Sequence, residues 1–168
     1  MILWLIGMMG SGKTTVGEKA AAELELSFID TDLLITSVSG RSIPVLWEEG
    51  GEESFRTLER QMVASAADSG PVVVATGGGA VLDADSVALM RSSGLVVWLS
   101  ATAQALEERV GTAGGRPLLV DPAPGARLDA LLAERRHLYA AAAHHEIATD
   151  GRSIEDVVAD VIALWRAS

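Results

Sequence analysis

The sequence predicts one α/β domain, built as a parallel sheet that helices cover on both faces. Strand-like and helix-like segments alternate along all 168 residues, which is the pattern of repeated strand–helix units. The first strand-like run, Ile2–Ile6, is apolar at every position, as is typical of a strand buried on both faces. No linker or internal repeat interrupts the pattern, so we expect a single domain over residues 1–168.

The first half of the chain contains two of the predicted strands and four of the predicted helices. Apolar residues four positions apart predict the first helix, and glycines end several elements. In chain order, the elements are a strand at Ile2–Ile6, a helix at Thr14–Leu26, a strand at Ser27–Ile29, a helix at Leu33–Val38, a helix that follows Ser42 as its N-cap and stops at Gly50-Gly51, and a helix at Glu52–Ala67.

The second half contains three strands and four helices. Thr102 and Ser153 are N-cap residues, and Asp156 completes a short capping box with Ser153. The segment Gly111–Ala126 has four glycines and three prolines without a helical period, and we expect a mobile loop there. The elements are a strand at Pro71–Ala75, a helix at Leu82–Ser92, a strand at Leu95–Leu99, a helix from Thr102 to Val110, a helix at Arg127–Ala143, a weak strand at Glu146–Ala148 and a last helix after Ser153.

The composition excludes several classes of protein. With 13 basic and 23 acidic residues, the net charge of −10 argues against nucleic acids and anionic membranes as partners. The absence of cysteine excludes a disulfide scaffold, a zinc finger and a thiol catalyst, and it fits a reducing, cytoplasmic compartment. The apolar N-terminus lacks the positive charge of a signal peptide, and no apolar run is long enough to span a membrane.

A phosphate-binding loop follows the first strand. Residues 7–14 read GMMGSGKT and match the pattern GxxxxGK[ST], with a strand before it and a helix after it. Glycines let successive backbone N–H groups point into one concavity, and the helix adds its positive N-terminal end. Lys13 reaches the β- and γ-phosphates of a nucleotide in such a loop, and Thr14 offers a hydroxyl to Mg²⁺. The alternative is a glycine-rich turn that binds nothing, and the flanking elements argue against it.

Two further motifs fall at strand ends beside this loop. Asp30-Thr31-Asp32 follows the second strand and Gly77-Gly78-Gly79 follows the third, and ligands collect at the carboxyl ends of parallel strands. The third strand lacks the terminal Asp that many such enzymes use for their metal, so we expect Asp30 to hold a metal-bound water. Asp32 is placed to accept a proton from a substrate hydroxyl. The alternatives are a helix cap for the Asp pair and a plain turn for the triplet, although three adjacent glycines also expose their N–H groups.

Several arginines are candidates for holding anions. Arg56 lies one turn into the long helix, and Glu59 is on the same face to orient it. Arg116 lies in the Gly- and Pro-rich loop, and Arg135 and Arg136 are adjacent in a later helix. Taken singly, each arginine is more typically a solvated surface residue. An acidic protein that binds two anions, however, needs several arginines in its cleft.

Taken together, these motifs resemble the shikimate kinase family. The matching segments follow in order along essentially the whole chain, and the combination of DTD, the GE…FR…E segment and GGGA is quite specific to that family. The segments are GMMGSGKTT, FIDTDLLI, GRSIPVLWEEGGEESFRTLE, ATGGGAVL, RPLL and ERRHLY.

The resemblance implies a fold, a reaction and partners. The fold would be the three-layer P-loop kinase fold with five parallel strands in the order 2-3-1-4-5, a substrate-binding segment near residues 31–60 and a lid near 111–125. The reaction would transfer the γ-phosphate of ATP to the 3-hydroxyl of shikimate, with Mg²⁺, on the route to chorismate and the aromatic amino acids. We expect a cytoplasmic monomer that binds no nucleic acid and no membrane.

The resemblance also implies roles for single residues. Asp32 would be the base, with Lys13 and Arg116 as the other catalytic residues, and Thr14 and Asp30 would hold Mg²⁺. The acceptor would contact Asp32, Arg56, Gly77, Gly78, Gly79 and Arg135. The nucleotide would contact Gly10, Ser11, Gly12, Lys13, Thr14, Thr15, Arg109, Arg116 and Arg152.

Two departures from the family pattern and two alternative functions remain. Trp47 stands where Phe is common, and Ile154 stands where some members have Pro beside the adenine. Another small-molecule kinase of the same fold, such as a gluconate kinase, is the nearest alternative, and the DTD, FR and GGGA motifs argue against it. A non-catalytic ATP-binding module is the second alternative, against which stands the joint presence of Lys13, Thr14, Asp32 and Arg116.

Replacing Arg116 with Ala is expected to lower turnover more than it weakens nucleotide binding. An arginine in a lid over the phosphates strengthens its contact as charge redistributes in the transition state. The measurement is kcat with both substrates, set beside the dissociation constant for ATP. Equal losses in the two quantities would mean that Arg116 contributes to binding alone.

Overall fold

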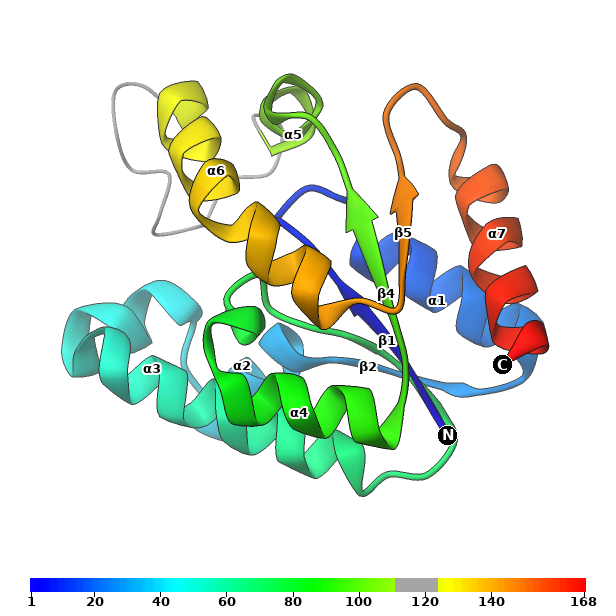
Figure 1. The fold of residues 1–168 in the computed structure, drawn as a ribbon. Helices are drawn as coiled ribbons and strands as arrows, with labels where there is room; N and C mark the ends of the chain where they lie inside the picture. The colour runs from blue at the N-terminus through cyan, green and yellow to red at the C-terminus, as the bar shows by residue number, and fades with distance from the viewer. Residues whose placement is uncertain (111–123) are drawn as a thin grey trace.

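The protein folds around one five-stranded parallel sheet with the strand order β2-β3-β1-β4-β5 (Figure 1). The structure is a computed structural model that describes residues 1–110 and 124–168. The α/β class and the strand order expected from the sequence are confirmed. The strands are β1 (Ile2–Ile6), β2 (Ser27–Asp30), β3 (Val72–Ala75), β4 (Gly94–Ser100) and β5 (His145–Ala148).

Helices cover both faces of the sheet. In Figure 1, α1 and α7 lie on one face, and α3, α4 and α6 lie on the other. Among the helices of the described residues, none is both long enough and apolar enough to cross a bilayer. The helices are α1 (Lys13–Leu24), α2 (Thr31–Ser39), α3 (Ile43–Ala67), α4 (Ala84–Ser93), α5 (Ala103–Val110), α6 (Pro124–Ala142) and α7 (Ile154–Ala167), with a short 3₁₀ helix η1 at Ala80–Leu82.

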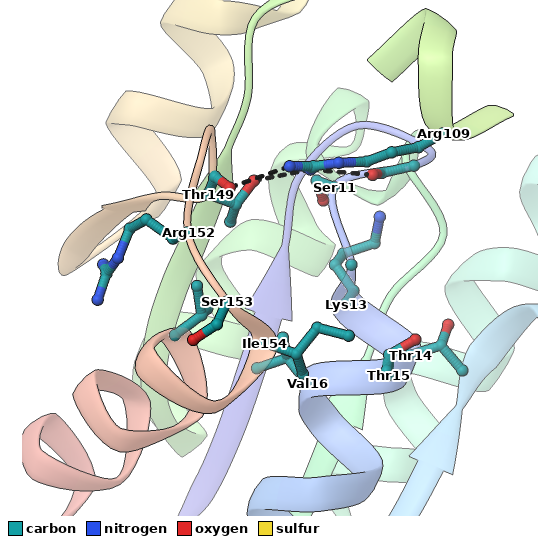
Figure 2. A pocket seen from close by; sticks show the side chains of 13 residues that line it. Ser11, Lys13, Thr14, Thr15, Val16, Arg109, Thr149, Arg152, Ser153 and Ile154 are labelled. Carbon is teal, nitrogen blue, oxygen red and sulfur yellow. Dashed lines mark hydrogen bonds between the residues drawn. The ribbon is translucent and has the colours of Figure 1, made fainter. Parts of the chain in front are cut away.

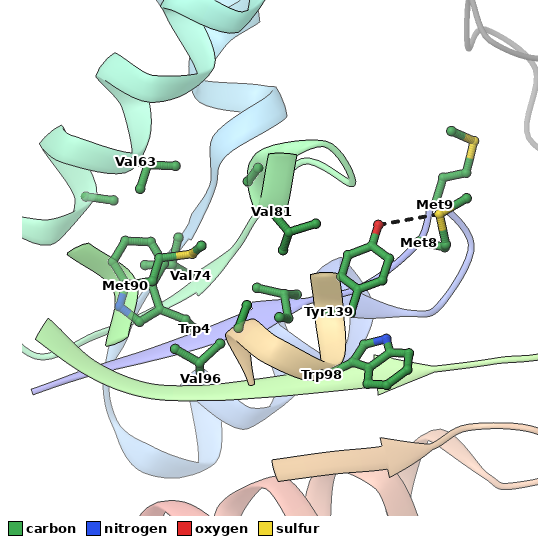
Figure 3. Packing of buried hydrophobic residues seen from close by; sticks show 14 of the residues in the cluster. Trp4, Met8, Met9, Val63, Val74, Val81, Met90, Val96, Trp98 and Tyr139 are labelled. Carbon is green, nitrogen blue, oxygen red and sulfur yellow. Dashed lines mark hydrogen bonds between the residues drawn. The ribbon is translucent and has the colours of Figure 1, made fainter. Parts of the chain in front are cut away.

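Alternating side chains of β1 pack into the two layers of the core. Trp4 contributes to the cluster under α3, α4 and α6, which Figure 3 shows with Met90 beside it. Leu3 and Leu5 face α1 and α7 in a second cluster. Because successive strand residues point to opposite faces, burial on both sides requires the continuous apolar run seen in the sequence.

A third, smaller cluster holds α2 against α3. Its buried members are Ile35, Leu46, Phe55 and Met62. The helix break predicted at Gly50-Gly51 is present within this region, because Gly51 has φ 70° and ψ −178° and divides α3 into two helical parts. Ser42 precedes α3 as expected but makes no side-chain cap bond there.

Four predicted helix boundaries were wrong by two residues or more, each for a local reason. α2 begins at Thr31 rather than Leu33, because the Asp30 side chain caps it. α1 ends at Leu24 rather than Leu26, because Glu25 adopts a left-handed conformation. α4 begins after Asp83, which accepts the Ser86 N–H, rather than at Leu82. α6 begins at Pro124 rather than Arg127, and the fixed φ of proline suits a first helical turn. The caps predicted at Thr102 and Ser153 are confirmed.

His144 joins the end of α6 to β4. Its backbone N–H donates to the Val96 carbonyl at 2.8 Å, and the Val96 N–H donates to the imidazole Nδ1 at 3.0 Å. Nδ1 accepts a hydrogen bond only while it carries no proton. Burial and, after it, the charges of Arg91 and His145 lower the pKa of His144 from its usual value. The folded state therefore favours the neutral imidazole.

The free energy of unfolding is expected to fall as the pH drops below about 6.5. The unfolded His144 binds a proton near its ordinary pKa and the folded one only at lower pH, so this contribution is complete above the unfolded pKa and is lost below it. Urea unfolding over this range measures the effect. His144→Asn offers an acceptor oxygen that does not titrate, and the same pH slope in this variant would contradict the assignment.

Candidate active site

Three loops meet at one edge of the sheet. β1, β2 and β3 are neighbours and run parallel, so the segments that follow them leave the sheet from the same edge. In the register of the sheet, both Leu5 and Asp30 pair with Ala75, and the strand ends are therefore nearly level. The phosphate-binding loop, the segment from Asp30 to Asp32 and the glycine triplet lie together as expected.

The loop between β1 and α1 forms an anion cradle from its backbone. Gly10 and Gly12 have φ of 79° and 93°, a left-handed conformation that favours glycine. The N-cap residue of α1 is Gly12, which makes no side-chain cap bond, and the positive N-terminal end of a helix attracts anions. Lys13 is buried, and its ammonium donates to the carbonyls of Gly7 and Met8 at 2.9 and 2.8 Å.

A cavity of about 440 Å³ lies beside this loop (Figure 2). Arg109 spans it, because its guanidinium donates to the Gly10 carbonyl at 3.4 Å and to the hydroxyl and carbonyl of Thr149 at 2.9 Å each. All the described residues that we expect to contact the nucleotide line this cavity. The lining comprises Gly10, Ser11, Gly12, Lys13, Thr14, Thr15, Val16, Arg109, Thr149, Arg152, Ser153, Ile154 and Val157.

The segment after β5 forms the far wall of this cavity. The Arg152 guanidinium extends away from the phosphate-binding loop in Figure 2 and pairs with Asp160 at 2.8 Å. Ile154 is 41 % exposed and presents an apolar side chain to the cavity. Thr149, which holds Arg109, belongs to no recognisable motif, and the sequence gives no signal for it.

A second cavity, of about 180 Å³, adjoins the first. Lys13 and Thr14 line both cavities, so the two meet at the first turn of α1. Its volume is below that of pockets for drug-sized ligands and suits a small molecule. The lining comprises Lys13, Thr14, Asp30, Asp32, Leu33, Thr76 and Gly78.

Asp30 has two sets of partners at this junction. Its Oδ1 accepts the N–H groups of Asp32 and Leu33 at 3.0 and 3.2 Å, which caps α2. Its Oδ2 accepts the Thr14 hydroxyl at 2.7 Å. The helix cap is therefore real, and the same carboxylate lies beside Thr14. Asp32, in the first turn of α2, borders the second cavity.

Charged groups occupy the space that side chains on the glycine triplet would fill. A Cβ on Gly77 would lie 2.5 Å from Glu59 Oε1 and 2.6 Å from Asp32 Oδ1. A Cβ on Gly79 would overlap the Arg56 guanidinium. The triplet thus permits close approach of three charged side chains, in addition to the exposed N–H groups that the sequence predicts.

Arg56 is fixed between carboxylates and aromatic rings. Its guanidinium donates to Glu59 at 2.7 Å and to Glu52 at 3.3 Å. The bond to Glu59 supports the orienting role expected for that residue. The guanidinium carbon lies 5.8 Å from the Trp47 ring centroid and 5.5 Å from that of Phe55. Burial raises the pKa of Glu59, and the charge of Arg56 opposes that shift.

Arg135 approaches the triplet from α6. Its side chain is buried, and its Nη1 lies 3.4 Å from the Gly78 carbonyl. Arg135 contacts Gly78, and Arg56 lies against the neighbouring Gly79, so the two arginines approach adjacent residues of the triplet.

The other arginines have different surroundings. The guanidinium of Arg136 lies over the Trp98 ring, 5.9 Å from its centroid. Arg116, and with it most of the lid expected near residues 111–125, lies outside the described residues.

Comparison with known proteins agrees with these observations. A model of the shikimate kinase family matches residues 9–166. A curated shikimate kinase from Symbiobacterium thermophilum is 46 % identical over 164 residues, which cover 96 % of this chain and 94 % of the relative. The structure of a shikimate kinase from Acinetobacter baumannii in complex with shikimate superposes with a TM-score of 0.95 at 34 % identity, covering 99 % of this chain and 93 % of that one.

A gluconokinase from Sinorhizobium meliloti is also similar, with a TM-score of 0.63 at 20 % identity and coverage of 98 % and 91 % of the two chains. At that identity the likeness shows the fold alone, and the gluconate kinase alternative is the less supported one. The family match, in contrast, covers residues 9–166, which extend from within the phosphate-binding loop into α7. This chain therefore belongs to the shikimate kinase family.

Proposed function

We propose that the two cavities divide the substrates of a shikimate kinase between them, with ATP in the larger and shikimate in the smaller. The chain is an ATP-dependent kinase of this family. The observation that carries the proposal is that Lys13 and Thr14 line both cavities. Phosphoryl transfer requires the donor and acceptor oxygens in line about one transferring group, with positive charge beside it.

In this proposal the larger cavity binds the nucleotide. The backbone of the phosphate-binding loop and the Lys13 ammonium bind its phosphates, and Arg109, Arg152 and Ile154 flank its base. The bonds from Arg109 to Gly10 and Thr149 support this division, because they fix a flat guanidinium at the edge of the cavity.

Mg²⁺ fits the oxygen donors at the junction. Thr14 Oγ1 and Asp30 Oδ2 are 2.7 Å apart, and Mg²⁺ in proteins takes one or two such oxygens together with waters and substrate phosphates. We assign these two residues to the ion, Asp30 through a water. When bound, Mg²⁺ would neutralise charge on the β- and γ-phosphates.

The smaller cavity and the glycine triplet bind the acceptor in this proposal. Asp32 takes the proton of the 3-hydroxyl as that oxygen attacks the γ-phosphate. Arg56 and Arg135 take the carboxylate, because a guanidinium offers it two parallel hydrogen bonds. Their contacts with Gly79 and Gly78, next to the cavity, support the assignment.

The remaining assignments concern the whole protein. We keep a monomer as the proposed oligomeric state. The net charge of −10 supports a protein that binds neither nucleic acid nor anionic membrane, and the lack of cysteine supports the cytoplasm. We keep residues 31–60 as the substrate-binding segment and residues 111–125, with Arg116, as the lid.

A panel of acceptors with ATP and Mg²⁺ tests the function. Shikimate is expected to release ADP in a coupled assay, while gluconate and nucleoside monophosphates at the same concentration release none above background. A higher rate with gluconate would overturn the acceptor assignment. Binding of ATP without turnover on any acceptor would identify a binding module instead of an enzyme.

Asp32→Asn is expected to lower kcat by about 10²–10⁴-fold and to leave the dissociation constant for ATP unchanged. The amide keeps the shape of the carboxylate but takes up no proton. Asp85→Asn is the matched control, because Asp85 holds the equivalent first-turn position in α4. Near-normal turnover of the Asp32 variant would remove this residue from the base role.

Gly79→Ala is expected to raise the KM for shikimate about tenfold or more, the effect of a lost charged hydrogen bond, with little change in the KM for ATP. The backbone of Gly79, with φ −97° and ψ −6°, accepts alanine, so the change acts through the displaced Arg56 alone. Gly78→Ala is the control for stability, because a Cβ on Gly78 would meet no atom closer than 3.5 Å. The melting temperatures of the two variants are compared by thermal unfolding. A melting temperature lowered equally by Gly78→Ala would argue against the Arg56 contact as the cause.

A further inference from the structure

Tyr139 is the only tyrosine of the chain, and it is completely buried beside the glycine triplet. Figure 3 shows its ring next to Trp98 and its hydroxyl directed at Met8 of the phosphate-binding loop. The two ring centroids are 5.7 Å apart at an interplanar angle of 20°, and the hydroxyl lies 3.4 Å from the Met8 sulfur. A phenylalanine would fill the same space, so packing alone does not require the hydroxyl.

The closest polar partner of the hydroxyl is the Gly78 carbonyl, to which it donates at 2.6 Å. The Arg135 guanidinium donates to the same carbonyl at 3.4 Å. Arg135 precedes Tyr139 by one helical turn, so both side chains lie on the same face of α6. Burial raises the pKa of Tyr139 far above its usual value, and the phenol therefore remains a donor. The Gly78 carbonyl oxygen thus accepts from both side chains.

Three consecutive glycines have the largest backbone freedom of any tripeptide, so their conformation depends on external contacts. The Gly77 N–H donates to the buried Thr31 hydroxyl at 2.9 Å. The Gly78 carbonyl accepts the Tyr139 hydroxyl at 2.6 Å and a longer bond from Arg135 at 3.4 Å. Loss of the phenol hydroxyl would therefore release the middle of the triplet, and with it the carbonyl that Arg135 contacts.

We propose that Tyr139 is a positioning residue for the acceptor, whose hydroxyl holds the Gly78 peptide, and through it the Arg135 guanidinium, in the binding arrangement before shikimate arrives. The inference rests on the proposed function, which assigns Gly78 and Arg135 to the acceptor. Such preorganisation reduces the entropy lost on binding. The lining of the nucleotide cavity includes none of these three residues, so the effect falls on the acceptor.

Steady-state kinetics of Tyr139→Phe, with each substrate varied in turn, test the proposal. The KM for shikimate is expected to rise about three- to tenfold, the range for one lost hydrogen bond, while the KM for ATP stays unchanged. Ser93→Ala is the matched control. Its hydroxyl accepts the Trp4 Nε1–H at 3.1 Å in a partly buried site at the other end of β4, so this variant loses a structural hydroxyl and should keep both KM values.

A second measurement needs no substitution. Because Tyr139 is the only tyrosine, incorporating fluorotyrosine labels this position alone and gives one fluorine NMR resonance. Saturation with shikimate is expected to shift that resonance more than saturation with ADP does. This readout also decides the matter if Tyr139→Phe does not fold.

Three results would overturn the inference: an unchanged KM for shikimate in the folded Phe variant, an equal rise in both KM values, or a fluorine resonance that shikimate does not move. A lower melting temperature with both KM values unchanged belongs to the first result and would leave Tyr139 a purely structural residue. Failure of the proposed function is a separate outcome, because the unmodified enzyme would then not phosphorylate shikimate at all.

Discussion

Glu59 is buried beside Arg56, and removal of the arginine would leave the buried carboxylate without its cation. The two are 2.7 Å apart, and the Asp32 carboxylate packs against the same stretch of backbone. The backbone fits beside these charged groups only because Gly77 and Gly79 carry no side chain. Both partners belong to α3, and their side chains lie against the loop after β3, which the proposed acceptor site shares.

Contacts of the same kind explain how a chain of net charge −10 can bind two anions. Each cation of the described site already has acceptors. Lys13 donates to two loop carbonyls, Arg56 to two glutamates and Arg135 to the Gly78 carbonyl. These acceptors hold the cations in place without a ligand, so that little side-chain freedom is left to lose when an anion binds.

The features predicted from sequence are those encoded in a few consecutive residues. The phosphate-binding loop, the strand-end motifs and the break at Gly51 belong to this class, because local backbone geometry determines each of them. Thr149 and Tyr139 do not, since their bonds to Arg109 and Gly78 join residues 40 and 61 positions apart. The left-handed Glu25 that ends α1 was equally invisible, because glycine is the usual residue in that conformation. The roles given to Asp32 and Arg116 stay predictions.

The small cluster between α2 and α3 affects the order in which parts of the protein unfold. Its four buried residues form a hydrophobic core separate from the two that enclose the sheet. Regions with fewer buried apolar contacts open at lower free energy than the rest of a domain. We therefore expect α2 and the first part of α3 to open as a unit of their own, with amide exchange and proteolysis beginning there while the sheet and the phosphate-binding loop are still folded.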